Sequence, residues 1–315
     1  MNFTSNHRWP ISLTYFISNN CNYSCLHCNV KKGSTLSKKI GYLKDFKKEL
    51  QKLKSIGYSN IVFTGGEPFL ASNLVEDIQF ALNIGYTITV FTNGSIFNEI
   101  ILKKIKESNG RIIISLHGLR DYHDEFVRQK GAFDSALTLL EYCNKNNIQT
   151  EVNTSVNIEN QFEINELNRL LADFNVNKHV LLYTSPIGFA KHQKFIFNLE
   201  RWYDYIHNFD SYDRKVPLYA ELMVMTREEW VLLSESEKEK TKCSIPKNKR
   251  ISIISKDQFA NCPINASNSQ NWSKEYLSKG IFSSWKTINP NCPAHALELD
   301  VEKYIRICPF YTKKI

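Results

Sequence analysis

Strand-like segments alternate with amphipathic helical segments between residues 11 and 183, and this alternation restricts the possible folds most strongly. β-Branched and aromatic residues mark six strands, at residues 11–17, 60–64, 86–91, 111–116, 148–156 and 179–183. The segments between them repeat apolar residues every three or four positions, as one face of a helix does. The pattern predicts an α/β fold with a parallel sheet and right-handed helical crossovers.

Polar or glycine-containing motifs follow five of the predicted strands directly. These motifs begin at Cys21, Gly65, Thr92, Ser115 and Ser185. In parallel α/β barrels the chemistry takes place at the C-terminal ends of the strands. We therefore expect the five motifs to lie on one rim and to form one site.

The first motif places Cys21, Cys25 and Cys28 in one short loop with the spacing C-x3-C-x2-C. Thiolates are soft ligands that select iron–sulfur clusters, zinc or copper. A structural zinc ion and an ordinary ferredoxin cluster both use four protein ligands, whereas this loop offers three. The loop alone therefore leaves three alternatives: a cluster with one open iron, a zinc site with a distant fourth ligand, or three unrelated buried cysteines.

Composition and charge limit the classes of protein to which this chain can belong. With 315 residues, 42% hydrophobic and 23% charged, the chain suits one large globular domain, or one such domain with a small appendage. Eight cysteines without a signal peptide favour metal binding over disulfides and predict a cytoplasmic protein. No apolar run is long enough to span a membrane. The net charge of +8 is scattered and forms no basic stripe, which argues against nucleic-acid binding.

The run Gly65-Gly66-Glu67-Pro68 follows the second strand, and together with the cysteine loop it resembles the radical S-adenosylmethionine (radical SAM) superfamily. The resemblance covers residues 11–190 and implies a partial, open (β/α)6 barrel over residues 1–190. It also implies a 4Fe–4S cluster on the three cysteines, with an open iron that binds S-adenosylmethionine. In this family, reductive cleavage of that ligand yields a 5′-deoxyadenosyl radical that abstracts a hydrogen atom.

The same resemblance implies contacts to S-adenosylmethionine. The family's positions for the amino group, the carboxylate and the adenosine match Gly65, Gly66, Glu67, Pro68, Asn93, Ser115, Arg128, Asn153 and Gly188. Alternatives remain for several of them: a simple turn with a helix-start proline, a generic Asn-Gly turn, and a surface arginine. His27 either packs near the adenine or is an exposed loop residue, and His117 stands where the family often has Asp. Cys143 ends an amphipathic helix and is expected to be a buried, inert thiol.

The C-terminal part of the chain differs in composition. Residues 191–241 break the alternation and are interpreted as a helical bridge, and residues 242–315 contain Cys243, Cys262, Cys292 and Cys308. The two cysteine pairs bracket hairpin-like runs, with turns near residues 256–258 and 302–303. Each unit resembles those of the SPASM and twitch modules, which implies a second, auxiliary 4Fe–4S cluster on four cysteines. A C-x2-C-x5-C-x3-C segment of the full SPASM pattern is absent, and zinc is the alternative occupant.

The expected function is radical chemistry on a ribosomal peptide: cross-linking, epimerisation or oxidation. A twitch-type dehydrogenase of a small molecule is the alternative, for which Glu221 and His295 are conceivable acid or base groups. A zinc-thiolate scaffold or nucleic-acid-binding protein is the non-enzymatic alternative. Expected partners are the substrate, an electron donor such as flavodoxin or ferredoxin, and a separate leader-peptide-binding protein, because the cysteine loop begins at residue 21. The sequence identifies no catalytic acid, base or hydrogen donor.

Overall fold

The computed structural model describes residues 12–209 without 31–33, 35, 42, 44 and 56, and also 215–235, 238, 250–255, 258–260, 270–271, 300, 302–306 and 312–314. The three cysteines of the loop lie within this part of the chain. The predicted auxiliary ligands Cys243, Cys262, Cys292 and Cys308, and also His295, lie outside the described residues.

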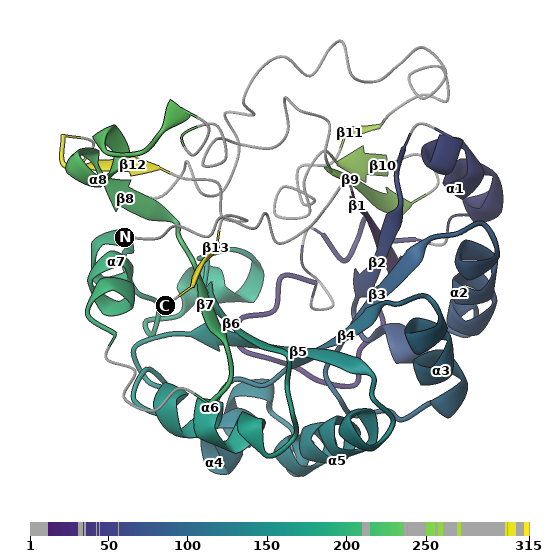
Figure 1. The fold of residues 1–315 in the computed structure, drawn as a ribbon, viewed down its shortest axis with the longest axis horizontal. Coiled ribbons are helices and arrows are strands. Elements are labelled where there is room, and N and C mark those ends of the chain that lie inside the picture. The colour runs from purple at the N-terminus through teal and green to yellow at the C-terminus, as the bar shows by residue number, and fades with distance from the viewer. Residues whose placement is uncertain are drawn as a thin grey trace.

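A curved, open sheet forms the centre of the molecule (Figure 1). Seven parallel strands follow one another in chain order: β1 (Ser12–Ser18), β2 (Asn60–Gly65), β3 (Thr87–Thr92), β4 (Arg111–Ser115), β5 (Gln149–Val156), β6 (Lys178–Tyr183) and β7 (Leu218–Glu221). All six predicted strands are confirmed. The seventh lies in the segment interpreted as a helical bridge, so the barrel continues one strand further than the six expected. β7 has only four residues, too few to show the period-two pattern that identifies a strand.

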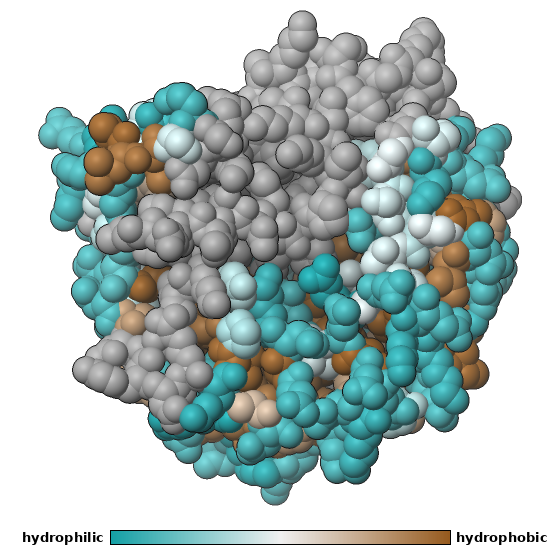
Figure 2. Space-filling model, viewed as in Figure 1, coloured by the Kyte–Doolittle hydropathy of each residue, from teal (hydrophilic) through white to brown (hydrophobic). Residues whose placement is uncertain are grey.

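Helices cover the convex face of the sheet (Figure 1). They are α1 (Phe46–Ser55), α2 (Leu74–Asn83), α3 (Glu99–Glu107), α4 (Arg120–Val127), α5 (Ala132–Lys145), α6 (Ile164–Ala172) and α7 (Leu199–His207). Each buries one apolar stripe, as Ile101, Leu102 and Ile105 of α3 do. The strands are buried on both faces, which explains their nearly continuous apolar runs. Hydrophilic residues dominate the outward surface of the helices (Figure 2).

The described parts of the C-terminal segment add strands to both edges of the parallel sheet. β9 (Arg250–Ser255) pairs parallel with β1, and β10 (Gln258–Ala260) and β11 (Gln270–Asn271) extend the sheet antiparallel. The antiparallel pairing of β9 with β10 confirms the first predicted hairpin. β13 (Thr312–Lys314) pairs antiparallel with β7 at the opposite edge. These additions cover edges that would otherwise expose unpaired backbone groups.

Several short elements complete the described chain: the 3-10 helices η1 (Pro68–Leu70) and η2 (Gly188–His192), the strand β8 (Val224–Thr226) and the helix α8 (Arg227–Val231). β12 (Tyr304–Arg306) follows the second predicted turn and pairs antiparallel with β8. The apolar side chains of Val231 and Leu232 at the end of α8 are exposed. None of the helices that the structure describes is both long and apolar enough to cross a lipid bilayer.

Candidate active site

A cavity of about 750 Å³ lies at the C-terminal ends of β1 to β4. The three loop cysteines line it together with Gly65, Gly66, Asn93 and Ser115. The motifs after the first four strands therefore meet at one rim, as their position in the sequence predicted. Its volume is within the range typical of sites for small organic ligands.

Helix α4 holds the middle of the cysteine loop through its last carbonyl groups. The backbone N–H of Ser24 donates to the carbonyl of Val127 at 3.2 Å, and that of Leu26 donates to Phe126 at 3.0 Å. The last carbonyls of a helix have no partner within the helix, so they are free to accept these bonds. The helix ends at Arg128, which adopts the left-handed conformation with φ 58°. Sequence reasoning missed this contact, because backbone carbonyls leave no residue-type signal.

Glycines allow the neighbouring backbone to approach the two ends of the loop. A Cβ atom on Gly65 would lie 2.2 Å from the Ser18 carbonyl oxygen, and one on Gly66 would lie 2.0 Å from that of Asn20. The backbone N–H of Gly66 donates to the Ser18 carbonyl at 2.7 Å. At the other end, a Cβ on Gly188 would lie 2.7 Å from Asn29 Cα. These three glycines therefore pack against the backbone at the two ends of the cysteine loop. This packing role is separate from any contact that they make with a ligand.

Glu67 joins the end of β2 to the end of β3. Its Oε1 atom accepts hydrogen bonds from the Phe69 N–H at 3.0 Å and the Thr92 hydroxyl at 2.9 Å, and Oε2 accepts from the Asn93 N–H at 2.7 Å. The residue is 1% exposed, and this burial raises the pKa of its carboxyl to about 7. Pro68 occupies the first position of η1, as expected of a helix-start proline. A contact between Glu67 and the ligand ammonium stays a prediction.

Asn93 reaches from the end of β3 to the start of the cysteine loop. Its side-chain nitrogen Nδ2 lies 3.8 Å from the sulfur of Cys21 and 3.0 Å from Oδ1 of Asn22. Burial raises the pKa of the Cys21 thiol, partly offset by hydrogen bonds to the sulfur. Metal binding requires the thiolate, so cluster assembly must release this proton.

Three histidines form an aromatic cluster at the cavity: His117 and His123, which are buried, and His27, which is half-buried. His27 stacks on Phe126 with ring centroids 4.9 Å apart, which favours the packed alternative for this residue over the exposed one. Burial lowers the pKa of His27 and of His123 to about 4 and that of His117 well below its ordinary value, so all are neutral at pH 7.

Two buried nitrogens of this cluster, His27 Nδ1 and His123 Nε2, have no hydrogen-bond partner within the described part of the chain. His123 Nδ1 accepts from the His117 backbone N–H at 3.0 Å, so the neutral ring carries its proton on Nε2. His117 and His123 were not assigned as site residues from the sequence. The position of His117 directly after the fourth strand was the available signal.

Three further predicted contacts lie on the same rim outside the cavity lining. Arg128 is exposed, Asn153 is buried in β5 with 3% exposure, and Gly188 packs against the backbone of Cys28 and Asn29. Glu221 is buried at the end of β7, where Oε2 accepts the Tyr183 N–H at 3.2 Å. Cys143 is 0% exposed, as predicted for an inert thiol, and burial raises its pKa to about 12.

The three cysteines at the cavity offer the thiolate ligands that an iron–sulfur cluster uses. All three loop cysteines line one cavity. Within the ranges that the structure describes, no three His, Cys, Asp or Glu side chains gather as ligands of one metal ion. A cubane cluster binds each thiolate at a different iron, so it accepts sulfurs that are further apart than the ligands of one zinc ion.

Comparisons with known proteins agree with this assignment. The family model described as Radical SAM superfamily matches residues 15–171. Fe-coproporphyrin III synthase of Methanosarcina barkeri is 30% identical over 154 residues, which are 49% of this chain and 39% of the relative. The antilisterial bacteriocin subtilosin biosynthesis protein AlbA of Bacillus subtilis is 26% identical over 182 residues, 57% of this chain and 40% of the relative. The chain thus spans well under two thirds of these relatives.

Solved structures show the same fold. Streptococcus suis SuiB bound to its precursor peptide SuiA superposes with a TM-score of 0.69 at 14% identity, covering 92% of this chain and 71% of SuiB. The matched family segment includes β1 to β5, the cysteine loop and the Gly-Gly-Glu-Pro run. The chain therefore contains a domain of the radical SAM superfamily.

Proposed function

We propose that this protein is a radical SAM enzyme that modifies a ribosomal peptide. The observation that carries the first half of this proposal is the convergence of Cys21, Cys25 and Cys28 on one cavity at the C-terminal rim of the parallel strands. The family implies a 4Fe–4S cluster and S-adenosylmethionine, and the donor set of three thiols fits the cluster. When bound, these cofactors supply a 5′-deoxyadenosyl radical that abstracts a hydrogen atom from a C–H bond.

The chain's own residues position the cofactors and shield the site. The carbonyl groups of Phe126 and Val127 accept hydrogen bonds from the backbone of the cysteine loop. Gly65 and Gly66 have no side chain that would collide with the backbone before it. Neutral histidines and Val127 line the adjoining wall, so this side of the cavity adds no charge. The predicted contacts to S-adenosylmethionine are Gly65, Gly66, Glu67, Pro68, Asn93, Ser115, Arg128, Asn153 and Gly188, of which Gly65, Gly66, Asn93 and Ser115 line the cavity.

Relatives that act on peptides support the second half of the proposal. AlbA is described as a subtilosin biosynthesis protein, and SkfB of Bacillus subtilis as a sporulation killing factor maturation protein, 26% identical over 159 residues. The likeness to peptide-bound SuiB extends over 92% of this chain.

A small-molecule substrate is the second candidate. It is favoured by the identity to Fe-coproporphyrin III synthase and to GTP 3′,8-cyclase of Clostridium perfringens, 27% identical over 192 residues. Both names describe chemistry on compounds that are not peptides. Incubation with GTP or with Fe-coproporphyrin III distinguishes this candidate directly.

The proposal includes an auxiliary 4Fe–4S cluster on Cys243, Cys262, Cys292 and Cys308, with zinc as its alternative. It also includes the domain boundaries at residues 190/191 and 241/242, an external electron donor such as flavodoxin or ferredoxin, and a separate leader-binding protein. The auxiliary cluster would accept an electron from the substrate or anchor the substrate.

Anaerobic iron and sulfide analysis tests the cofactors. We expect about eight irons in the reconstituted parent and about four in the Cys21→Ala/Cys25→Ala/Cys28→Ala variant. 5′-Deoxyadenosine should form with reductant in the parent alone. Cys143→Ala is the matched control, because it removes a thiol outside the cavity and should keep the iron and the activity. A colourless, zinc-binding parent that forms no nucleoside would overturn the proposal, and four irons falling to none would remove the auxiliary cluster.

Substrate class needs a separate experiment. A displayed library of random peptides is incubated with the reconstituted protein, reductant and S-adenosylmethionine. We expect enriched peptides to stimulate 5′-deoxyadenosine formation and to return with a changed mass. Turnover of GTP or Fe-coproporphyrin III, with no peptide that stimulates the reaction, would replace the peptide by a small molecule.

A further inference from the structure

The side-chain amide of Asn93 faces the sulfur of Cys21 across the entrance of the cysteine loop. Nδ2 lies 3.8 Å from this sulfur and 3.0 Å from Oδ1 of Asn22. The NH2 group carries two hydrogens, so it can serve both acceptors at once. The contact joins two segments that are 72 positions apart in the chain.

The orientation of this amide follows from its other contact. The backbone N–H of Ser95 lies 2.9 Å from Oδ1 of Asn93. A backbone N–H can only donate, so it requires the amide oxygen on its side and leaves the nitrogen on the side of Cys21. Asn22 is fixed in turn, because its Nδ2 donates to the Ser95 hydroxyl at 2.8 Å. Donors and acceptors match throughout this small network.

The backbone of Asn93 is anchored as firmly as its side chain. Its N–H donates to Glu67 Oε2 at 2.7 Å, and the preceding Thr92 hydroxyl donates to Oε1 of the same carboxylate. The Gly94 N–H donates to the Thr92 hydroxyl at 3.1 Å. The end of β3 is therefore held in one conformation, and the amide is directed at the sulfur before any cofactor binds.

Cys21 also accepts a contact from its own loop, the Tyr23 N–H at 3.4 Å. That donor belongs to the backbone and would be present with any side chain at the position. The Asn93 donor comes from another strand and depends on the side chain. It is the component of the sulfur's environment that a single substitution can remove.

We infer that Asn93 donates a hydrogen bond to the Cys21 thiolate in the loaded protein and raises the reduction potential of the cluster. The inference rests on the proposed function, because it needs the cluster on Cys21. Reduction adds negative charge to the cluster and its sulfurs, so a donor stabilises the reduced form more than the oxidised form. Hydrogen bonds to the sulfurs are one of the established determinants of cluster potentials. Asn93 is thus a positioning residue that tunes electron entry.

A redox titration followed by electron paramagnetic resonance tests the inference. The samples are the reconstituted parent, Asn93→Leu and Asn93→Ala, each with its iron and sulfide content measured. We expect a more negative midpoint potential for both variants. At a fixed potential, the ratio of reduced to oxidised catalytic cluster should fall about fivefold in Asn93→Leu, the scale of one hydrogen bond. Asn83→Leu makes the same exchange at an exposed position of α2 and should keep the parent's potential.

The outcomes separate the inference from the proposed function. A parent without iron at the three cysteines contradicts the proposed function. A parent with its cluster and an Asn93→Leu variant of unchanged potential overturns the inference and leaves the function standing. If Asn93→Leu fails to hold a cluster, Asn93→Ala decides, because it removes the donor and adds neither bulk nor charge. An unchanged potential in that variant likewise overturns the inference.

Discussion

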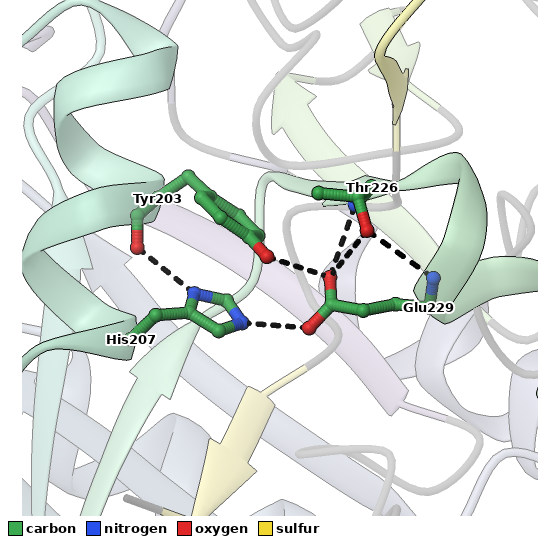
Figure 3. Close-up of polar contacts among 4 residues, drawn as sticks. All are labelled: Tyr203, His207, Thr226 and Glu229. Atoms are coloured by element: carbon green, nitrogen blue, oxygen red, sulfur yellow. Dashed lines mark hydrogen bonds and ion pairs between the residues drawn. The ribbon is translucent and has the colours of Figure 1, made fainter.

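Two regions of this protein are each organised around a glutamate that accepts several hydrogen bonds, yet the two carboxyls differ in ionisation. Glu67 joins β2 to β3 beside the cysteine loop, and its donors are two backbone N–H groups and one hydroxyl. Glu229 joins α7 to α8, and His207 is among its donors (Figure 3). Burial raises the pKa of Glu67 to about 7.

The cluster around Glu229 joins Tyr203 and His207 of α7 to Thr226, the last residue of β8, and to Glu229 of α8 (Figure 3). Glu229 Oε2 accepts the Tyr203 hydroxyl at 3.0 Å and the Thr226 N–H at 3.0 Å, and Oε1 lies 3.0 Å from His207 Nε2. His207 Nδ1 donates to the Tyr203 carbonyl at 2.9 Å, since a carbonyl can only accept. Burial alone would raise the pKa of Glu229, but the hydrogen bonds from His207, Thr226 and Tyr203 outweigh it and lower the pKa to about 2.

The comparison shows that the number of donors does not decide the ionisation of a buried carboxyl. Both glutamates accept hydrogen bonds, but Glu67 is 1% exposed, and the two backbone N–H groups and the hydroxyl that donate to it are all neutral. The Glu229 side chain is 15% exposed and has a partner that can carry positive charge. Burial therefore decides the pKa of Glu67 and raises it. The hydrogen bond from a histidine that can carry positive charge contributes most to lowering the pKa of Glu229.

The largest effect is expected from Gly66→Ala, which tests the backbone contact beside Glu67. The added Cβ would lie 2.0 Å from the Asn20 carbonyl oxygen, so the start of the cysteine loop must move. We expect nearly all iron at the three cysteines to be lost after reconstitution, with an unchanged far-ultraviolet circular dichroism spectrum. Gly131→Ala is the control, because its added Cβ would have no atom beyond its immediate chain neighbours within 4 Å. Its backbone has a left-handed φ of +80°, which disfavours alanine. It should keep its iron and lose about 1 kcal/mol of stability. Normal iron in Gly66→Ala would show that the close approach is dispensable.

Glu67→Gln is expected to destabilise the fold by about 1 to 3 kcal/mol, because the new NH2 group must face a donor and leave it unpaired. Urea unfolding of the parent and the variant measures the difference. Glu76→Gln is the matched control, since the Glu76 side chain is 69% exposed in a surface ion pair with Lys47. It should change stability by less than about 1 kcal/mol. Equal losses in both variants would contradict the assigned role of Glu67.

Tyr203→Phe removes one hydrogen bond to the Glu229 carboxylate and is expected to cost about 1.5 kcal/mol in urea unfolding. Iron content should not change, because the α7–α8 cluster makes no contribution to the cavity lining. Tyr219→Phe is the control for loss of a tyrosine hydroxyl outside this cluster. A loss of iron in Tyr203→Phe alone would show that the two regions are coupled.

The pH dependences of the two carboxyl contributions to stability should have opposite signs. The folded-state pKa of Glu67 is raised from 4.5 to about 7, so the folded protein binds more protons than the unfolded chain between these values. Its contribution to stability therefore falls as the pH rises through that window. The pKa of Glu229 is lowered from 4.5 to about 2, so its contribution is present above pH 4.5 and is lost as the pH falls toward 2.

Urea unfolding over these two windows measures each contribution as the difference between parent and variant. Glu67→Gln should remove the decline above pH 4.5, and Glu229→Gln should remove part of the decline below it. Slopes of the same sign for the two variants would contradict the comparison of the two carboxyls.

Local sequence patterns were sufficient where the signal lies within one element. The six strands were predicted, as were the position of Pro68 at the start of η1 and the burial of Cys143. The short strand β7 was missed because four residues carry too little periodicity. The pairing of β9 with β1 and of β12 with β8 joins segments more than 75 positions apart, and no local pattern specifies such partners.

By itself, the sequence determined the alternation of elements, the spacing of the three cysteines in their loop and the rim on which the motifs meet. These follow from residue types at fixed spacings and from the parallel direction of consecutive strands. Only the tertiary structure decided that α4 carbonyls hold the loop, that Asn93 faces the Cys21 sulfur, and that Glu67 is buried among neutral donors. The reason is physical: backbone contacts, hydrogen-bond direction and desolvation depend on distances between segments that are remote in the chain.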